Sequence, residues 1–177
     1  FTAAGTRVLT LRNLRFALPP FLVCAITIEN RLATVTVVLE HLTVDTAAVL
    51  NAGGLNAYGG PSGVTDIAIL DCLFRVAGNK AAVDAEDTSS VTILRSLFDV
   101  RSGATGVHLD SLQTTIADCR FLLQPEGSEA TGLVLEADLV RVPAHGGLVA
   151  GGSAALASLR AVLLRCLGIA ARGLPDR

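Results

Sequence analysis

The chain has few aromatic residues, and Trp and Met are absent. Of its 177 residues 4% are aromatic, although 51% are hydrophobic. The core therefore has to be filled by Val, Leu, Ile and Ala, which pack well in repeated layers of pleated strands. This composition favours stacked coils over a globule built around large anchors. The 17 Gly residues suit the tight corners that coils need.

An excess of either charge is also missing. The chain has 14 basic and 16 acidic residues, so the basic footprint of a nucleic-acid-binding protein is absent. No apolar run approaches the roughly 18 residues that cross a bilayer, and no signal peptide pattern is visible. Because the chain begins at Phe1 and enters a strand pattern almost at once, we expect a segment of a longer chain.

One phrase recurs along the chain and predicts its architecture. The segments 69–74, 93–98 and 116–121 each begin with Ile and end with Phe, and these Phe residues are 24 and 23 positions apart. A period in the low twenties indicates one structural coil per copy. Stacking the coils places the three Phe side chains side by side. Weaker copies of the phrase lie at 11–16, 39–44 and 159–164.

Each coil carries a second strand, led by a small residue. Gly106–Asp110 aligns with Gly132–Glu136 and with Ala82–Glu86, and a short turn leads from there to the next main strand. Alternating apolar residues in the main strand indicate one buried face. We predict one all-β domain over residues 1–177, a parallel β-helix solenoid of about seven coils. Its main strands should begin near residues 9, 37, 67, 91, 114, 140 and 157.

Three stretches interrupt this period. Residues 17–34 and 50–65 are predicted insertions, the first with a strand of its own at Leu22–Ile28 and the second rich in Gly. Residues 153–172 fit either a further coil of strands or an amphipathic helix that caps the solenoid. The sequence leaves both structures open for this last segment.

The phrase at Ile69–Phe74 resembles the Ile-x-Ile-x-Asn-Cys-x-Phe phrase of right-handed parallel β-helix proteins of the pectin-lyase-like kind. The resemblance covers residues 8 to about 150 and implies right-handed coiling. It does not select a function, because this architecture serves polysaccharide lyases and hydrolases, phage tailspikes, adhesins and surface filaments.

The catalytic motifs of those enzymes are missing. Polygalacturonase-like members carry Asn-Thr-Asp, Asp-Asp, Gly-His-Gly and Arg-Ile-Lys, and the nearest fragment here is Ala144-His145-Gly146. Lyase-like members need clustered carboxylates and a basic residue, whereas the single Lys, Lys80, falls on a turn. The three His residues lack metal-ligand spacing. We therefore predict no catalytic residue, no metal site and no cofactor, apart from the calcium considered next.

Stacking also predicts a column of acidic side chains. Glu86, Asp110 and Glu136 should point outward on successive coils, with His108 on the same face. Carboxylates about 4.8 Å apart could bind calcium through their oxygens or act as an acid and base pair. The alternative is a solvated acidic stripe that prevents edge-to-edge association.

Tyr58, the single Tyr, lies beside Asn56 in the Gly-rich stretch. An aromatic residue on a loop that leaves a β-helix can stack on a sugar ring. The alternative is a loop residue that packs on the flank. These two residues complete the candidate ligand-binding set with the acidic column and His108.

Two further columns are predicted to be structural. One contains small buried side chains, with two Cys residues about 10 Å apart and so too distant for a disulfide. The other alternates in charge, so that neighbouring coils can pair. Their members are Cys72, Ser96 and Cys119 in the first column and Asp71, Arg95 and Asp118 in the second.

The sequence thus predicts a structural role more readily than a chemical one. We expect a scaffolding segment of an extracellular or surface protein, such as a filament, fibre, adhesin or wall component. Its partners would be protein neighbours or further coils of the same chain, with no nucleic acid and no membrane span. The alternative is a carbohydrate-active module, either lyase- or hydrolase-like or glycan-binding, with a polysaccharide as its partner.

Overall fold

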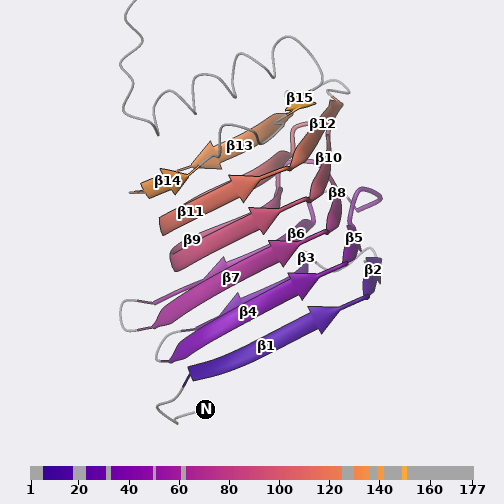
Figure 1. Cartoon of the computed structure of the whole chain (residues 1–177). Helices are drawn as coiled ribbons and strands as arrows, with labels where there is room; N and C mark the ends of the chain where they lie inside the picture. The colour runs from indigo at the N-terminus through magenta and orange to yellow at the C-terminus, as the bar shows by residue number, and fades with distance from the viewer. Residues whose placement is uncertain are drawn as a thin grey trace, which may run out of the picture.

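The structure, a computed structural model, describes residues 6–17, 23–30, 33–49, 51–60, 63–124, 130–135, 139–141 and 149–150. Every regular element in these residues is a strand, and all strand pairs are parallel. The strands wind into a β-solenoid, as Figure 1 shows. The predicted all-β parallel solenoid is therefore confirmed.

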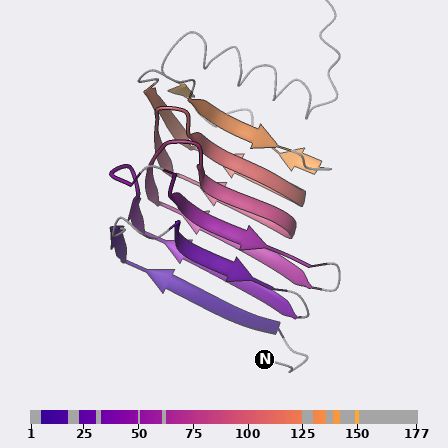
Figure 2. The same ribbon diagram turned by 180° about the vertical axis from the view of Figure 1, so that it is seen from behind.

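The solenoid has three stacks of strands. In the main stack, neighbours pair in the order β1, β4, β7, β9, β11 and β14, and in the corner stack in the order β2, β5, β8, β10, β12 and β15. A return stack, nearest the viewer in Figure 2, pairs β3, β6, β9, β11 and β13. The bounds are β1 Thr6–Arg12, β2 Arg15–Ala17, β3 Cys24–Glu29, β4 Thr34–Glu40, β5 Thr43–Asp45, β6 Gly53–Tyr58, β7 Val64–Leu70, β8 Leu73–Ala77, β9 Ala81–Leu94, β10 Leu97–Arg101, β11 Thr105–Ala117, β12 Arg120–Gln124, β13 Thr131–Leu135, β14 Leu139–Arg141 and β15 Val149–Ala150.

The described residues make about four turns rather than the seven coils predicted. The main strands from β1 to β11 account for these turns. The predicted coil near residue 140 contributes only the short strand β14, and the coil near residue 157 lies outside the described residues. The same holds for residues 153–172, for which the sequence left a coil or a capping helix open.

The described parts of the two predicted insertions belong to the regular coil, which corrects the expectation from the sequence. Within 17–34, β3 pairs with β6, and within 50–65, β6 pairs in turn with β9. Both are therefore return strands. Longer connections around them disturb the period of the sequence, but not the stacking of the strands.

A second correction concerns the step from return strand to main strand. In β9 and β11 the chain continues from one to the other without the short turn that was predicted. The register shifts at this step, because Leu109 faces Ala85 whereas Ser111 faces Thr88. β9 therefore contains one extra residue, which is a β-bulge, and Asp87 at this bulge has a positive φ of 53°.

The core contains the predicted aromatic stack. The ring centroids of Phe74 and Phe98 are 5.4 Å apart, those of Phe98 and Phe121 are 4.8 Å apart, and all three side chains are fully buried. In two return strands the residue beside these rings is Gly, because a backbone carbonyl of the next coil and a Phe ring leave no room for a side chain. A Cβ atom at Gly106 would lie 2.9 Å from Phe121, and one at Gly54 would lie 2.9 Å from Phe74.

The corner between main and corner strands has the same backbone conformation in five coils. The corner residues all have φ between 49° and 55°, in the left-handed region that Asn and Asp tolerate best. The next residue turns inward, and in three coils it belongs to the predicted column of small side chains, which is buried as expected. The corner residues are Asn13, His41, Asp71, Arg95 and Asp118.

Candidate functional site

The candidate site lies on the outer face of the return stack. Along a strand, alternate side chains point to opposite faces of the sheet. In β9, Val83 and Ala85 are fully buried in the core, so Asp84 and Glu86 point outward. The outer face is only partly exposed, because neighbouring strands flank each side chain.

Register brings side chains from three coils together on this face. Asn56 of β6 faces Asp84 of β9, and Asp84 faces His108 of β11. Two residues further along, Tyr58 faces Glu86. Strand partners of this kind are about 4.8 Å apart, so the five residues occupy one compact patch. Four of them belong to the candidate set from the sequence, and Asp84 is new.

His108 and Asp84 are in direct contact across the two coils. The distance from His108 Nδ1 to Asp84 Oδ1 is 2.8 Å. One donor atom each from Asp84, Glu86 and His108 lie within 4.8 Å of one another. Two carboxylates and an imidazole therefore converge on one point of the outer face.

The negative charges of this patch act on Tyr58. Its pKa is raised, first by partial burial and then by the negative charges of Asp84 and Glu86. Among the described residues, neither carboxylate forms an ion pair with a Lys or Arg side chain. Tyr58 itself is the last residue of β6 rather than a loop residue, which corrects the sequence analysis, and its side chain is 38% exposed.

Asp110 lies apart from this group. The bulge in β9 ends the register of the return strands just before Asp110, which is exposed and lies at the bend of β11. There it borders a hollow of about 310 Å³, shared with the bulge residue Asp87 and lined also by Gly60, Gly63, Thr88, Ser89, Ser111 and Leu112. Glu136, the third member of the predicted acidic column, lies outside the described residues.

Asp84 is the residue that the sequence analysis missed, although a signal for it was present. It precedes Glu86 by two positions and therefore shares its face. For His108, which the sequence did name as a candidate, spacing along the chain could not indicate its partners. Its partners come from a neighbouring coil, 24 residues earlier in the case of Asp84.

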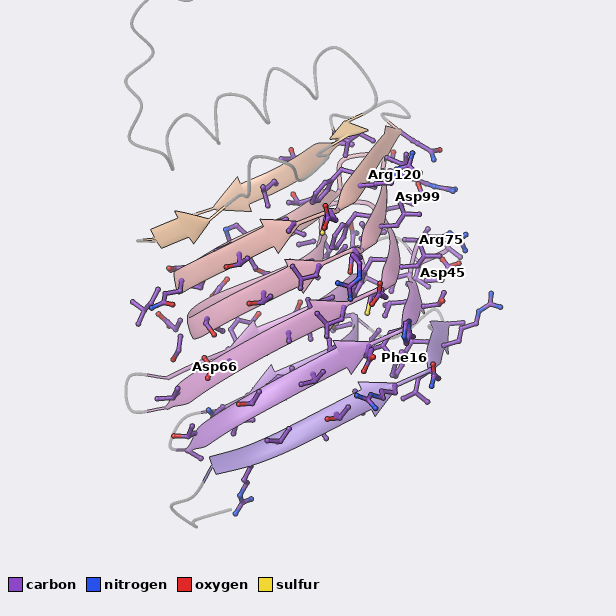
Figure 3. All side chains as sticks on the ribbon, in the orientation of Figure 1. Phe16, Asp45, Asp66, Arg75, Asp99 and Arg120 are labelled. Carbon is purple, nitrogen blue, oxygen red and sulfur yellow. The ribbon has the colours of Figure 1, made fainter. Side chains whose placement is uncertain are left out.

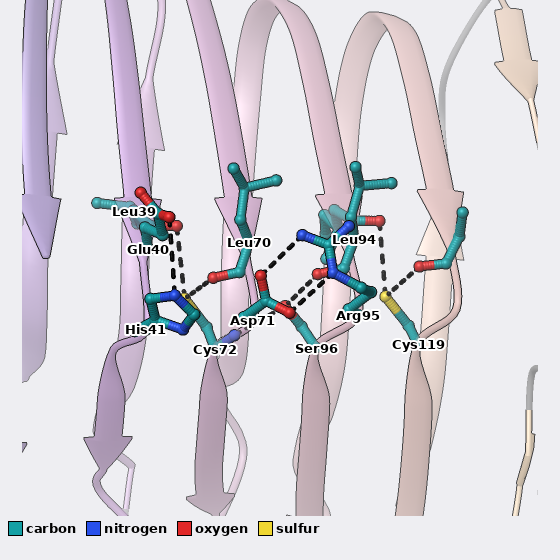
Figure 4. A network of polar contacts seen from close by, with 12 residues as sticks. Leu39, Glu40, His41, Leu70, Asp71, Cys72, Leu94, Arg95, Ser96 and Cys119 are labelled. Carbon is teal, nitrogen blue, oxygen red and sulfur yellow. Dashed lines mark hydrogen bonds and ion pairs between the residues drawn. The ribbon is translucent and has the colours of Figure 1, made fainter. Parts of the chain in front are cut away.

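The column of small side chains is buried as predicted, and the charged column contains one pair between neighbouring coils, Asp71–Arg95. Arg95 forms a two-point contact with Asp71 of the preceding coil (Figure 4), and side-chain hydrogen bonding to Arg95 lowers the pKa of Asp71. In the column of small side chains the thiols donate to backbone carbonyls, Cys119 Sγ to Ala117 at 3.3 Å. Burial raises the pKa of Cys72 and Cys119, and both thiols are free.

A further ionic network, not predicted from the sequence, follows the outer face of the corner stack. Figure 3 shows Asp45, Arg75 and Asp99 along this side of the solenoid. Asp99 is nearly buried and accepts hydrogen bonds from Arg101 at 2.8 Å and Gln124 at 2.9 Å. Arg75 contacts both Asp45 and Asp99. The network joins four coils by ion pairs and hydrogen bonds, and we call it the ionic clasp of the corner stack.

Comparison of the chain with protein-family models, with curated proteins and with solved structures gave no match. No helix suited to crossing a membrane occurs in the part of the chain that the structure describes. The solenoid fold is therefore the level at which this chain is classified.

Proposed function

We propose that this chain is a scaffolding segment of an extracellular or surface protein, such as a filament, fibre, adhesin or wall component. In this proposal its partner is a further parallel coil, which stacks on the β1 end of the solenoid. The coil belongs to a neighbouring subunit or to the same parent chain. The pectin-lyase-like resemblance remains part of this proposal, because solenoids of that kind serve as rods and fibres.

The exposure of core positions in the first coil carries the proposal. Leu9 faces Val37 in register, yet Leu9 is 49% exposed and Val37 is 1% exposed. Likewise, Leu14 is 43% exposed, whereas Leu42, which holds the same place one coil later, is 1% exposed. β1 and β2 are also the terminal strands of their sheets in the described residues. Their free edges offer backbone groups and an apolar surface to another coil.

The outer faces support a role in stacking rather than in chemistry. Ion pairs and hydrogen bonds on these faces run from coil to coil, as in Arg12–Glu40, Asp71–Arg95 and Asp45–Arg75–Asp99. Each added coil would continue these ladders as well as the stack of the core. A solenoid of this construction gains rigidity with every coil, because each coil contacts its neighbours over the whole cross-section.

The test is end-to-end association of the 177-residue chain, measured by sedimentation velocity over a range of concentrations. We expect oligomers whose formation depends on β1. Leu9→Lys should abolish them, since it places a charge against the core of the added coil. Val8→Lys is the matched control, because Val8 is the neighbouring residue of β1 and points outward.

A wild-type chain that stays monomeric at all concentrations would contradict stacking by a neighbouring subunit. Equal loss of association in both variants would also contradict it, because a general increase in charge would then explain the effect. Circular dichroism of each variant verifies that the solenoid remains folded.

A second function, glycan binding, is favoured by one specific observation. Tyr58 lies directly beside Glu86 in register and within the field of Asp84, so an exposed aromatic ring and hydrogen-bonding groups share one face. Sugar rings are bound by such combinations of an apolar ring face and polar neighbours.

Glycan binding is tested with a panel of neutral and acidic polysaccharides, with and without calcium. The function predicts binding that Tyr58→Ala removes and that Leu122→Ala, on the exposed face of β12, leaves intact. New unsaturated or reducing ends would extend this function to catalysis. A folded chain that binds none of the panel would exclude it for those glycans.

A further inference from the structure

We propose that Asp84, Glu86 and His108 form a binding site for a divalent late first-row metal ion, with Zn²⁺ as the ion that fits best. This site goes beyond the scaffolding role and does not depend on it.

The geometry is already close to that of a metal site. In zinc sites the metal–ligand distances are about 2.0–2.2 Å, so two neighbouring ligand atoms are about 3.3 Å apart. His108 Nδ1 and Asp84 Oδ1 are 2.8 Å apart, within hydrogen-bonding distance. The ion would bind between these two atoms, with Nδ1 unprotonated and the ring hydrogen on Nε2. A small rotation of the Glu86 side chain brings its carboxylate into range, since the three donor atoms lie within 4.8 Å.

All three side chains belong to regular strands, and none of them lies on a loop. Asp84 and Glu86 are two residues apart on β9, and His108 is the register partner of Asp84 on β11. Both strands are held in the stack from either side, β9 by β6 and β11 by β13. Ligands on regular strands lose little conformational freedom when an ion binds, because the backbone is already ordered.

The donor set selects the class of ion. Calcium takes six to eight oxygen ligands, whereas an imidazole nitrogen suits zinc, copper, iron and nickel. One nitrogen and two carboxylates on a partly exposed face also leave room for water as a fourth ligand. That arrangement is typical of zinc sites with three protein ligands. The proposal therefore names zinc in place of calcium, the ion that the sequence analysis considered beside a solvated acidic stripe.

The charge of the site agrees with this assignment. Two carboxylates lie side by side, and in the described part of the chain no Lys or Arg side chain forms an ion pair with either of them. A divalent ion would neutralise both at once. Among the described residues, this is the group of His, Cys, Asp and Glu side chains whose donor atoms converge in this way.

The test is Zn²⁺ titration of the full 177-residue chain by isothermal calorimetry, in a reducing buffer free of chelators. Two variants disable the site. His108→Val introduces the residue that occupies the same column one coil later, Val134, and Glu86→Gln keeps the shape of the side chain. His41→Asn is the matched control, because it removes an imidazole outside the site at a corner whose positive φ of 53° Asn tolerates.

We expect saturable Zn²⁺ binding that weakens by at least about tenfold in both site variants and is unchanged in the control. Zn²⁺ should also raise the melting temperature of the wild type more than that of His108→Val, because an ion that binds the folded state stabilises it. Calcium should produce neither effect. All variants retain every Cys, so zinc bound by thiols contributes equally to each titration.

Three outcomes would overturn the proposal. These are a wild type without saturable Zn²⁺ binding, equal Zn²⁺ affinity in wild type and site variants, and calcium binding that depends on Glu86 while zinc does not bind. If His108→Val fails to fold by circular dichroism, the Glu86→Gln titration decides, since that side chain lies on the outer face and fills no part of the core.

Discussion

Arg95 holds Asp71 of the preceding coil through two parallel hydrogen bonds. The distance from Nε to Oδ1 is 2.8 Å and that from Nη2 to Oδ2 is 2.7 Å. Both residues occupy the left-handed corner of their coils. Because they hold the same position in neighbouring coils, the guanidinium group of Arg95 lies directly beside the carboxylate of Asp71. This contact lowers the pKa of Asp71, chiefly through the hydrogen bonds.

The first prediction concerns acid stability. Because the pKa of Asp71 is lower in the folded than in the unfolded state, its carboxylate stabilises the fold above the ordinary Asp value of about 3.9. This contribution is lost as the pH falls through the lowered folded value. We expect Arg95→Gln to bring the pKa of Asp71 back toward the ordinary range in an NMR titration. High salt should shrink the difference, since the pair is exposed. An unchanged Asp71 titration in Arg95→Gln would contradict this account.

The second prediction concerns the aromatic stack. Phe98 lies between two other rings and is fully buried, so Phe98→Ala removes both ring contacts and leaves a cavity. We expect a loss of about 3–5 kcal/mol in the free energy of unfolding, measured by denaturant titration. Leu122→Ala, on the exposed side of β12, should cost far less. Similar losses in both variants would argue against a core centred on the stack.

The third prediction compares two adjacent glycines of β6. A Cβ atom at Gly54 would lie 2.3 Å from the carbonyl oxygen of Ala82 and 2.9 Å from Phe74, whereas a Cβ atom at Gly53 meets its nearest atoms at 3.2 Å. Gly54→Ala should therefore destabilise the fold by about 1–3 kcal/mol through overpacking. Gly53→Ala should have the smaller effect. Thermal unfolding of the two variants checks the order, and the reverse order would refute the packing argument.

The fourth prediction concerns the ionic clasp of the corner stack. Asp99→Ala deprives Arg101 and Gln124 of a nearly buried acceptor. Hydrogen bonds to a charged group contribute about 1.5–3 kcal/mol, and we expect a loss in that range. Asp66→Ala, which removes a single contact with Ser90 on the main stack, is the control. The free energy of unfolding of both variants is measured by chemical denaturation. An equal loss in Asp99→Ala and Asp66→Ala would show that the clasp is only a set of isolated surface contacts.

The repeat in the sequence predicted most of the stacking correctly. Aligning Val107 with Val83 and with Leu133 gives the register that the structure has. The Phe stack, the Cys column and the Asp71–Arg95 pair follow from the same alignment. The early coils were harder, because longer connections around β3 and β6 hide the period. The sequence pattern therefore predicted insertions where the structure has these two return strands.

The candidate site could be predicted only in part. Period-two alternation gave the outward direction of Glu86 and His108, and by the same argument it could have given Asp84. Alternation could not predict that Asp110 lies apart from Glu86. The bulge in β9 adds one residue after Ala85, and this shifts the register of the strand pair at Asp110. A bulge depends on how two strands fit together, and a single strand pattern does not reveal it.

By itself, the sequence determined the repeat, the inward and outward faces of each strand and the parallel stacking, since all three follow from periodicity and burial. The tertiary structure alone decided which side chains of different coils meet. The contact of His108 with Asp84, the place of Tyr58 beside Glu86 and the displacement of Asp110 depend on register, connection length and one extra residue. These are properties of paired strands, and the distance between residues along the chain does not specify them.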